Sequence, residues 1–500
     1  MLTFRQPAVC YLQFSKINHF KEMRIFFIIL LTCSSICSFS QNITSDTFHA
    51  DSSLAHASVS LCVADAISGN ITIEYNAGIS LIPASVMKII TSSAALELLG
   101  PDYTFKTTVG YTGTLNKRSG LLKGNIIIHG GGDPALGSKY FPDHYSNFLN
   151  NWLSEIKKLG IKKIKGKVIT DDSYYDYLPV PGKWIWEDIG NYYGAGAYGL
   201  SVYDNTYEIH FKTSSENTLP SMNEIIPNEC KSELSDFLIS SGTTDEGYVF
   251  AAPYSTAGWI AGAIPVNQQD FVLKASITDP PLFLARLFNE RLKAFGIKIS
   301  GDPNSLRLEH NYQASKVIPI TETVSPTLAE IVTVLNHESV NLFAEHLIKE
   351  LGKKFKNNGS TVSGAQVIYE FLKSSGVDIN GSFIEDGSGL SPLNAVNTRE
   401  LVSLLVFLRN KGKYFNEFYS SLPDAGKNGT LKNCFTDPVF ESRLRVKSGS
   451  MTRVRSFAGY FTTVSGKKMV FSIIINNYSG PSKIITSAIE ENIKDLIINN

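Results

Sequence analysis

The sequence has no net charge, because its 46 Lys and Arg residues are balanced by 46 Asp and Glu residues. Without a basic excess the chain has no electrostatic attraction for a phosphate backbone, so nucleic acid is not expected as a partner. The chain also lacks the internal repeats that build solenoids and propellers. With 43% hydrophobic and 18% charged residues, its composition excludes a disordered, collagenous or multi-span membrane chain.

Cysteine is scarce as well, with six residues in a chain of 500. Beyond the N-terminal leader only Cys62, Cys230 and Cys434 remain, an odd and widely spaced set. Such a set makes neither a disulfide framework nor a zinc knuckle. We therefore expect no structural metal.

Long hydrophobic runs are missing too. The apolar stretch at 25–31 follows Met23 and Arg24 and leads into small residues that end near Ser40. It is shorter than the ~20 residues that a bilayer requires, and its charged start and small-residue exit are typical of a secretory signal peptide. We expect residues 1–40 to be this signal, with translation starting at Met23 and export to the periplasm or cell envelope. The alternative is an uncleaved anchor.

Strand and helix signals begin after this leader. Alternating residues over 58–65 and 71–75, separated by turn residues, predict a β-hairpin. The segment 85–99 has no Gly or Pro before Gly100, which occupies a C-cap position. Because its residues are nearly all apolar or small, we expect a buried helix there.

The middle of the chain has a different residue pattern from the segments on either side. Residues 105–315 carry short β-like runs between many Gly, Tyr and Asp turns, which predicts a β-rich insertion. We expect two small domains in it, with the inner one near 206–270. The segments 41–104 and 316–500 would then form one domain around the insertion.

The C-terminal part mixes both periodicities and indicates an α+β fold. Helices are expected at 281–295, 328–351, 364–375 and 483–498, and strands at 440–446, 456–463 and 468–476. The last helix places Ile485, Ile489, Ile493 and Leu496 on one stripe. This stripe fits peripheral association with a membrane surface, but we expect it to pack on the preceding sheet.

The chemistry resides in three short motifs, of which the first is the S-x-x-K at Ser85 and Lys88. Three residues make nearly one helical turn, so hydroxyl and amine project from the same face. A lysine whose pKa is lowered by burial can act as the base for such a serine. The same pattern occurs at Ser154 and Ser465, but in a surface-like helix and a hairpin turn. Only Ser85 opens a buried helix.

The second motif is the S-x-N at Ser339 and Asn341, in a helical or helix-linking stretch. A hydroxyl there can relay a proton, and a carboxamide can both accept from and donate to a substrate amide. The pattern alone is weak, since Ser215 and Asn217 match it in a loop-like segment.

The third motif is the single K-[ST]-G of the chain, Lys447 and Ser448 before Gly449, near the end of a predicted strand. A cation and a hydroxyl on one strand suit a substrate carboxylate, and a glycine lets the ligand approach the backbone. The following N–H, of Ser450, can point at a developing oxyanion.

In this order the three motifs are the signature of serine acyl-enzymes of the penicillin-recognising type. With D-G-S-G-L-S at 386–391, G-G-G-D-P at 130–134 and the long separation between the first two motifs, the sequence resembles the D-alanyl-D-alanine carboxypeptidases and endopeptidases typified by penicillin-binding protein 4. The resemblance runs from about residue 55 to 495. It implies a transpeptidase or β-lactamase-like domain, an antiparallel sheet flanked by helices, interrupted by a large insertion. Ser448 replaces the threonine usual in the family.

The resemblance implies a catalytic role for three residues and a substrate-binding role for a fourth. Ser85 would be the acylated nucleophile and Lys88 its proton acceptor. Ser339 would pass the proton toward the leaving amine, and Asn341 would hold the peptide backbone of the substrate.

It also implies binding residues. Lys447 and Ser448 would bind the terminal carboxylate of D-alanine, while the N–H groups of the nucleophile and of Ser450 would form the oxyanion hole. The family has an aspartate of the insertion near the side chain of the donor peptide. Asp171 is our expectation for it, and Asp172 fits almost as well.

We therefore expect an exported serine hydrolase that cleaves the D-Ala-D-Ala bond of peptidoglycan stem peptides, can also cut their crosslinks, and is acylated by β-lactam antibiotics. No metal or cofactor is implied. Two alternatives stay open: a β-lactamase, for which no deacylating base is identified, and a catalytically idle wall-binding protein. A zinc-protease helix is excluded because Asn341 stands four residues after His337, and no G-x-S-x-G elbow is present.

Overall fold

The protein is described by a computed structural model covering residues 52–230, 233–309 and 316–499. The expected signal peptide, 1–40, lies outside the described residues. Among the residues inside them, no helix is both long enough and apolar enough to cross a membrane.

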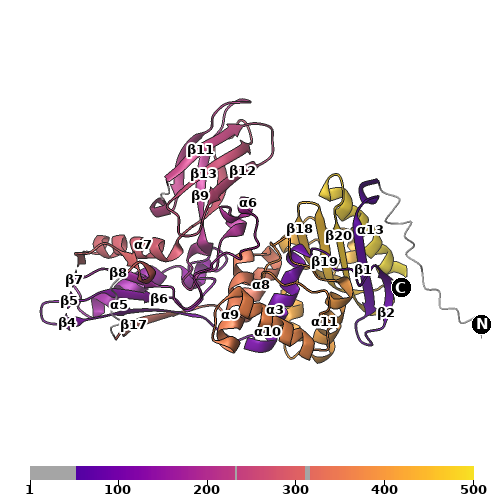
Figure 1. Cartoon of the computed structure of the whole chain (residues 1–500), viewed down its shortest axis with the longest axis horizontal. Coiled ribbons are helices and arrows are strands. Elements are labelled where there is room, and N and C mark those ends of the chain that lie inside the picture. Colours follow the sequence, from indigo (N-terminus) through magenta and orange to yellow (C-terminus); the bar gives the residue numbers. More distant parts are fainter. Residues whose placement is uncertain (1–51, 231–232, 310–315, 500) are drawn as a thin grey trace, which may run out of the picture. The chain divides into compact units, whose positions relative to one another are not determined.

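A five-stranded antiparallel sheet joins the two ends of the chain (Figure 1). Its strand order is β18-β19-β20-β1-β2, with β1 at Ser58–Asp65, β2 at Ile71–Tyr75, β18 at Leu444–Met451, β19 at Val454–Thr462 and β20 at Lys468–Asn476. The expected hairpin is confirmed as β1 and β2. Strand β1 pairs with β20 over its whole length, from Ser58 opposite Asn476 to Asp65 opposite Met469.

Strand β20 is the centre of this sheet and is buried from Met469 onward. Helix α11 (Thr398–Lys411) packs against β20, and α13 (Ser482–Asn499) packs against β19. The stripe of α13 is buried, with Ile485, Ile489 and Ile493 fully shielded from solvent. The expected packing of this helix on the sheet is confirmed.

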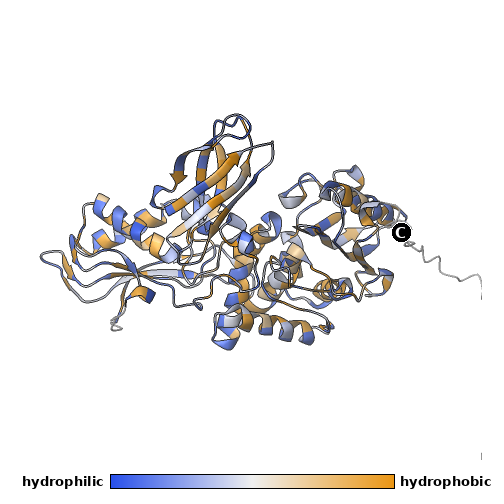
Figure 2. Cartoon of the chain, turned by 45° about the horizontal axis from the view of Figure 1, so that its top comes forward, coloured by the Kyte–Doolittle hydropathy of each residue, from blue (hydrophilic) through white to orange (hydrophobic). Residues whose placement is uncertain are grey.

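The remaining helices of this part lie between the sheet and the insertion. They are α3 (Met87–Leu99), α8 (Leu328–Glu338), α9 (Asn341–Lys356), α10 (Thr361–Ser374) and α12 (Phe415–Ser421). The helical ribbons carry both hydrophilic and hydrophobic residues (Figure 2), as expected for amphipathic helices, which have one apolar and one polar face. Helix α3 is buried along most of its length, as expected from its apolar sequence. Its regular part begins at Met87, so Ser85 lies in the 3-10 turn Ala84–Val86 just before it.

Two elements differ from the expectation. The predicted helix 328–351 is broken, because Ser339 adopts a left-handed backbone with φ of 57° and so ends α8. The strand expected at 440–446 is shifted to Leu444–Met451, since Phe440 ends a short 3-10 turn. Both shifts concern motif residues: Ser339 sits at a helix break and Lys447 in the middle of a strand.

The insertion is built from strands that, in the described residues, do not join the five-stranded sheet. One sheet has the order β16-β8-β6-β3-β17 and another β15-β7-β5-β4, with β3 at Lys106–Tyr111, β4 at Thr114–Asn116, β5 at Leu121–Lys123, β6 at Ile126–His129, β7 at Lys163–Lys165, β8 at Val168–Asp171, β15 at Lys298–Ile299, β16 at Asn304–Ser305 and β17 at Ile318–Val324. The helices here are α4 (Pro142–Tyr145), α5 (Phe148–Lys158), α6 (Trp186–Ile189) and α7 (Pro280–Ala294). Since β17 pairs with β3, residues 318–324 belong with this sheet rather than with the surrounding domain, beyond the expected end at 315.

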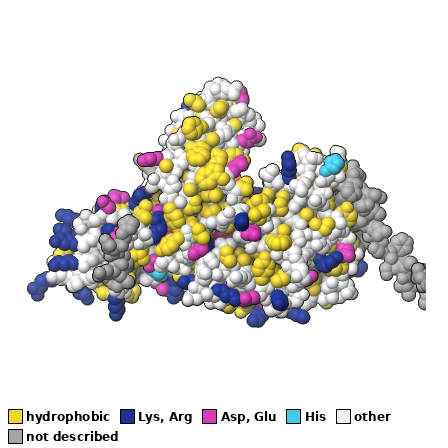
Figure 3. All heavy atoms as spheres, viewed as in Figure 1, with side chains coloured by type: hydrophobic (Ala, Val, Ile, Leu, Met, Phe, Trp, Pro, Cys, Tyr) yellow, Lys and Arg dark blue, Asp and Glu magenta, His cyan; other side chains and the backbone are white. Residues whose placement is uncertain are grey.

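Two three-stranded sheets form the inner part of the insertion. They are β10-β9-β14 and β11-β13-β12, with β9 at Thr206–Lys212, β10 at Ser221–Ile226, β11 at Glu233–Ser240, β12 at Glu246–Ala251, β13 at Ala257–Ile264 and β14 at Phe271–Ser276. In the second sheet Leu238, Val249 and Ile260 face inward and are fully buried. Its opposite face shows hydrophobic side chains at the surface (Figure 3).

Candidate active site

The site is built around the turn that carries Ser85. The preceding Ala84 has a positive φ of 48°, and two glycines approach this turn closely. A Cβ on Gly449 of β18 would lie 2.9 Å from the Ser85 nitrogen, and one on Gly389 would lie 1.9 Å from the Ala84 carbonyl oxygen. Only glycine permits these approaches, which bring β18 and the 386–391 segment against the serine.

Lys88 lies one turn after this serine and is fully buried. Its Nζ is 3.0 Å from Ser85 Oγ, 2.6 Å from Asn341 Oδ1 and 2.8 Å from the Ser388 carbonyl oxygen. A neutral amine has two N–H bonds and one lone pair. It can donate to the amide oxygen of Asn341 and to the carbonyl of Ser388, and its lone pair then accepts the proton of the Ser85 hydroxyl.

Burial also supplies the protonation state that this arrangement needs. It lowers the pKa of Lys88 from 10.5 to about 7, against the opposing charges of Asp386 and Glu345. A large fraction of the amine is therefore neutral near pH 7, where it can act as a base.

Ser339 and Lys447 form a second polar pair of the site. The Lys447 Nζ donates to Ser339 Oγ at 2.9 Å and to the Ser448 carbonyl oxygen at 2.8 Å. Burial, followed by the neighbouring Lys88, holds the pKa of Lys447 well below its usual value. The Ser448 hydroxyl is within 2.8 Å of Thr430 Oγ1. The three motifs, far apart in the sequence, thus meet in one place.

A cavity of about 570 Å³ opens over these groups. Ser85, Ser339, Asn341 and Ser450 line it, together with residues of the insertion and of the 386–391 segment. This volume falls in the range of ordinary ligand pockets. The buried amines of the two lysines lie behind this lining and contact it through the hydroxyls of Ser85 and Ser339.

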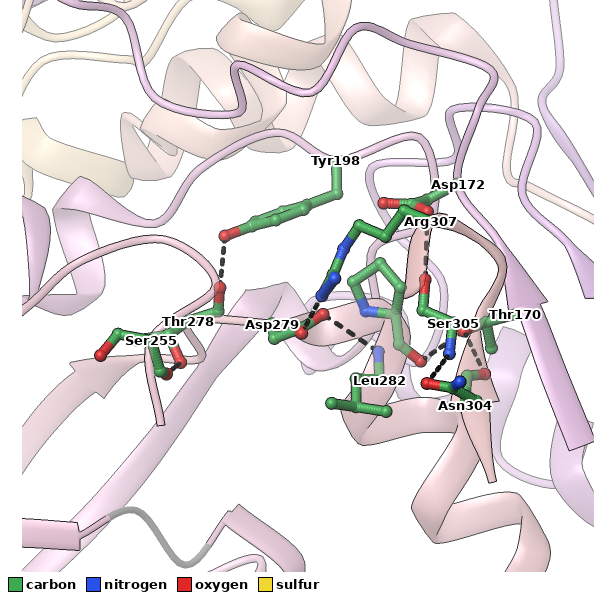
Figure 4. A network of polar contacts seen from close by, with 11 residues as sticks. Thr170, Asp172, Tyr198, Ser255, Thr278, Asp279, Leu282, Asn304, Ser305 and Arg307 are labelled. Atoms are coloured by element: carbon green, nitrogen blue, oxygen red, sulfur yellow. Dashed lines mark hydrogen bonds and ion pairs between the residues drawn. The ribbon is translucent and has the colours of Figure 1, made fainter. Parts of the chain in front are cut away.

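Asp171, expected beside the substrate, is not in the lining of this cavity. Its carboxylate lies 2.9 Å from His129 Nδ1, across the pair of strands β6 and β8. Asp172 is also directed elsewhere: it lies beside Arg307 and accepts from the Ser305 hydroxyl at 3.4 Å (Figure 4). The placement expected for Asp171 is therefore corrected, because strand pairing turns it toward a histidine of the insertion.

The insertion contributes two aspartates to the cavity lining, Asp204 and, in helix α6, Asp188. Burial raises the pKa of Asp188 to about 6, which a hydrogen bond from the Tyr193 hydroxyl partly opposes. The Tyr193 carbonyl in turn accepts from Asn341 Nδ2 at 2.8 Å, so this segment touches the second motif directly. Sequence reasoning missed Asp188. The sequence does contain one signal for this position: two of the four tryptophans in the chain, Trp184 and Trp186, stand just before Asp188.

The D-G-S-G-L-S segment is a turn held from both sides. The Asp386 carboxylate accepts from the nitrogens of Gly389 and Ser391 and from Trp184 Nε1, at 2.6–2.8 Å. Glu345 Oε1 accepts from the Ser388 nitrogen at 2.8 Å. These bonds fix the Ser388 carbonyl that receives a bond from the lysine of the first motif. The arrangement supports the view of this segment as a brace for the site.

Comparison with known proteins places this geometry in a family. The chain is 27% identical over 451 residues to a D-alanyl-D-alanine carboxypeptidase of Actinomadura sp. strain R39, covering 88% of this chain and 81% of that protein. It is 24% identical to the D-alanyl-D-alanine carboxypeptidase DacB of Haemophilus influenzae, covering 81% and 82%. The crystal structure of penicillin binding protein 4 from H. influenzae superimposes with a TM-score of 0.76 at 21% identity, over 88% of this chain and 97% of that one.

The structural likeness confirms the expected fold, a penicillin-recognising α+β domain with a large insertion. The family expected from the motifs is confirmed as well. The model of the D-Ala-D-Ala carboxypeptidase 3 (S13) family matches residues 41–496. Because that match spans nearly the whole chain, the protein belongs to the D-Ala-D-Ala carboxypeptidase 3 (S13) family, whose members are serine-type hydrolases.

Proposed function

We propose that the protein is a serine D-Ala-D-Ala carboxypeptidase acting on peptidoglycan stem peptides, with Ser85 as nucleophile. The observation that carries the proposal is the fully buried Lys88, whose Nζ lies 3.0 Å from Ser85 Oγ and whose pKa burial lowers to about 7. A hydroxyl in contact with a largely neutral amine can lose its proton as it attacks a carbonyl carbon.

Acylation begins when Ser85 Oγ attacks the carbonyl carbon of the penultimate D-alanine and its proton passes to Lys88 Nζ. The N–H groups of Ser85 and Ser450 stabilise the oxyanion, a contribution of about 3–4 kcal/mol per donor in comparable enzymes. The C–N bond then breaks and the terminal D-alanine leaves as an amine. Ser339 relays the proton held by Lys88 to this leaving amine, so that Lys88 is neutral again when acylation ends. The contact of the Ser339 hydroxyl oxygen with the Lys447 amine supports this role.

Deacylation completes the cycle. Water adds to the ester carbonyl and gives one proton to the neutral Lys88 amine; the bond from the acyl carbon to Ser85 Oγ then breaks, Lys88 returns this proton to Ser85 Oγ, and the peptide leaves as a carboxylic acid. A β-lactam acylates the same oxygen through opening of its ring, and the bulky acyl group then blocks water. An endopeptidase reaction follows the same steps when the leaving amine belongs to the side chain of a crosslinking diamino acid.

Substrate binding is shared by the motif residues and by the insertion. Lys447 and the Ser448 hydroxyl bind the terminal carboxylate, and Asn341 holds the peptide backbone. In place of Asp171, we assign Asp188 to the third-residue side chain of the donor peptide, whose amino group would pair with this carboxylate. The position of Asp188 in the cavity lining and its raised pKa, which falls when a cation neutralises the charge, support this assignment.

Labelling with fluorescent penicillin tests the proposal. We expect a stable adduct in the wild type and none in Ser85→Ala. Ser154→Ala is the matched control, because Ser154 belongs to an S-x-x-K motif on the exposed face of α5, and it should label normally.

Incubation with a soluble pentapeptide and with a crosslinked dimer, followed by mass spectrometry, then identifies the bond cleaved. Loss of one alanine from the pentapeptide is the expected product. In the labelling experiment, rapid turnover of penicillin without a lasting adduct would instead identify a β-lactamase. The absence of any adduct would identify a catalytically idle binding protein.

We also propose that the protein is exported to the periplasm or cell envelope. The leader pattern at 1–40 supports this, as does a substrate that lies outside the cytoplasm. Intact-mass measurement of protein secreted by a bacterial host would show a new N-terminus near Gln41; retention of the full leader would contradict cleavage.

A further inference from the structure

The outer face of the β11-β13-β12 sheet carries an exposed row of aromatic and aliphatic side chains. We call this the aromatic face and define it by Trp186, Phe237, Ile239, Tyr248, Phe250 and Trp259. Phe237 is 64% exposed and Trp259 39% exposed. Solvated sheet faces ordinarily alternate hydrophobic-in with polar-out, whereas here both faces are apolar. Figure 3 shows the hydrophobic side chains as a continuous column over this sheet.

The rings follow one another in close contact. Phe250 stacks on Trp259 with centroids 5.3 Å apart and ring planes 13° from parallel, which matches their direct cross-strand pairing. The ring centroids of Tyr248 and Phe250 are 6.4 Å apart, and those of Trp186 and Trp259 are 6.2 Å apart. These rings form a rigid platform whose ordering costs little side-chain entropy.

The aromatic face continues into the candidate active site. Its end at Trp186 is adjacent to Ile185, which lines the cavity, and lies two residues from Asp188. In the proposed binding mode the peptide carboxylate lies at Lys447 and the third-residue side chain at Asp188. The N-terminal end of the stem peptide, which is the end joined to sugar, then leaves the cavity on the side of Trp186.

The charges on this sheet limit the kinds of ligand that the aromatic face can bind. Residues 233–264 contain four acidic residues and no Lys or Arg. Such a surface repels anionic lipids and anionic polymers. A neutral polymer with apolar ring faces and hydroxyl donors fits it: C–H faces pack on the rings, and hydroxyls donate to the carboxylates.

On these grounds we propose that the aromatic face binds the glycan strand of peptidoglycan, a neutral β-linked N-acetylhexosamine polymer, while its stem peptide occupies the cavity. This inference rests on the proposed function, because the direction of the peptide defines where the sugar emerges. Contiguous exposed apolar patches mark interaction surfaces in monomeric proteins.

The test is calorimetric titration of the purified protein with a hexamer of β-1,4-linked N-acetylglucosamine. We expect saturable binding that weakens at least tenfold in Trp259→Ala and in Trp186→Ala, which lie on different elements. Phe355→Ala is the matched control: Phe355 is a 48% exposed aromatic residue on α9, outside the aromatic face, and its loss should leave binding unchanged.

A second measurement separates polymer from peptide. In Trp259→Ala we expect release of D-alanine from isolated cell-wall polymer to fall about tenfold, while penicillin acylation and hydrolysis of a soluble pentapeptide keep wild-type rates. Absence of hexamer binding, or equal loss in Phe355→Ala, would overturn the inference alone. A dimer that Trp259→Ala dissociates would assign the face to a second copy and also overturn it. A wild type that neither reacts with penicillin nor cleaves the pentapeptide would overturn the proposed function and this inference with it.

Discussion

The protonation of Lys88 makes a quantitative prediction about acylation. The amine accepts the serine proton only when it is neutral, and its pKa of about 7 lies inside the experimental range. At pH 8 about 90% of the amine is neutral and at pH 5 about 1%, so the rate constant should fall about 90-fold between them. In the acidic range the slope should approach one logarithmic unit per pH unit.

The assay is the second-order rate constant for labelling by fluorescent penicillin, measured at intervals from pH 5 to 9. Penicillin is useful because its carboxylate stays ionised throughout this range. Tryptophan fluorescence at each pH verifies that the protein remains folded. A rate constant that stays flat from pH 5 to 8 would refute the role of Lys88 as the base.

Two variants sharpen this experiment. Lys88→Arg places a permanent cation without a basic lone pair at this position, because arginine is not deprotonated in proteins. Acylation should fall at least about 1000-fold at every pH. Asp386→Asn removes the largest of the charges that raise the pKa of Lys88. Its midpoint should therefore move to lower pH, and a shift to higher pH would contradict the electrostatic explanation.

Three further variants test other parts of the structure. Gly449→Ala should lower penicillin acylation about 100-fold, because its Cβ would lie 2.9 Å from the Ser85 nitrogen and displace the turn. Asp188→Asn should lower kcat/KM about tenfold for peptides with an amino group on the third residue, with penicillin acylation unchanged. Burial lowers the pKa of His346 from 6.5 to about 3. Between these two pH values the unfolded chain binds more protons than the folded one, so the free energy of unfolding decreases as the pH is lowered, by up to about 1.4 kcal/mol per pH unit. His346→Gln should show a weaker dependence in urea unfolding at pH 7 and 5.

Part of the fold was predictable because it depends on local pattern. The hairpin of β1 and β2, the buried helix after Ser85 and the stripe of α13 follow from periodicity and end signals that a few neighbouring residues carry. The break at Ser339 was not predictable, because the sequence around it favours helix. In the structure Ser339 has a left-handed backbone, and its hydroxyl oxygen accepts from Lys447 of a distant strand. The same limit applies to Asp171, since nothing local indicates that strand pairing turns it to His129.

The sequence by itself determined the chemical groups: a serine and a lysine one turn apart, a hydroxyl with a carboxamide two residues on, and a cation beside a hydroxyl and a glycine on one strand. The types of these residues and their short spacings are fixed by the covalent chain and do not depend on packing. Only the tertiary structure decided that Lys88 is buried and so has a depressed pKa, that Gly449 and Gly389 close on the Ser85 turn, and that Asp188 reaches the cavity. Desolvation and contact depend on what other segments bring near, and those segments lie hundreds of residues away in the chain.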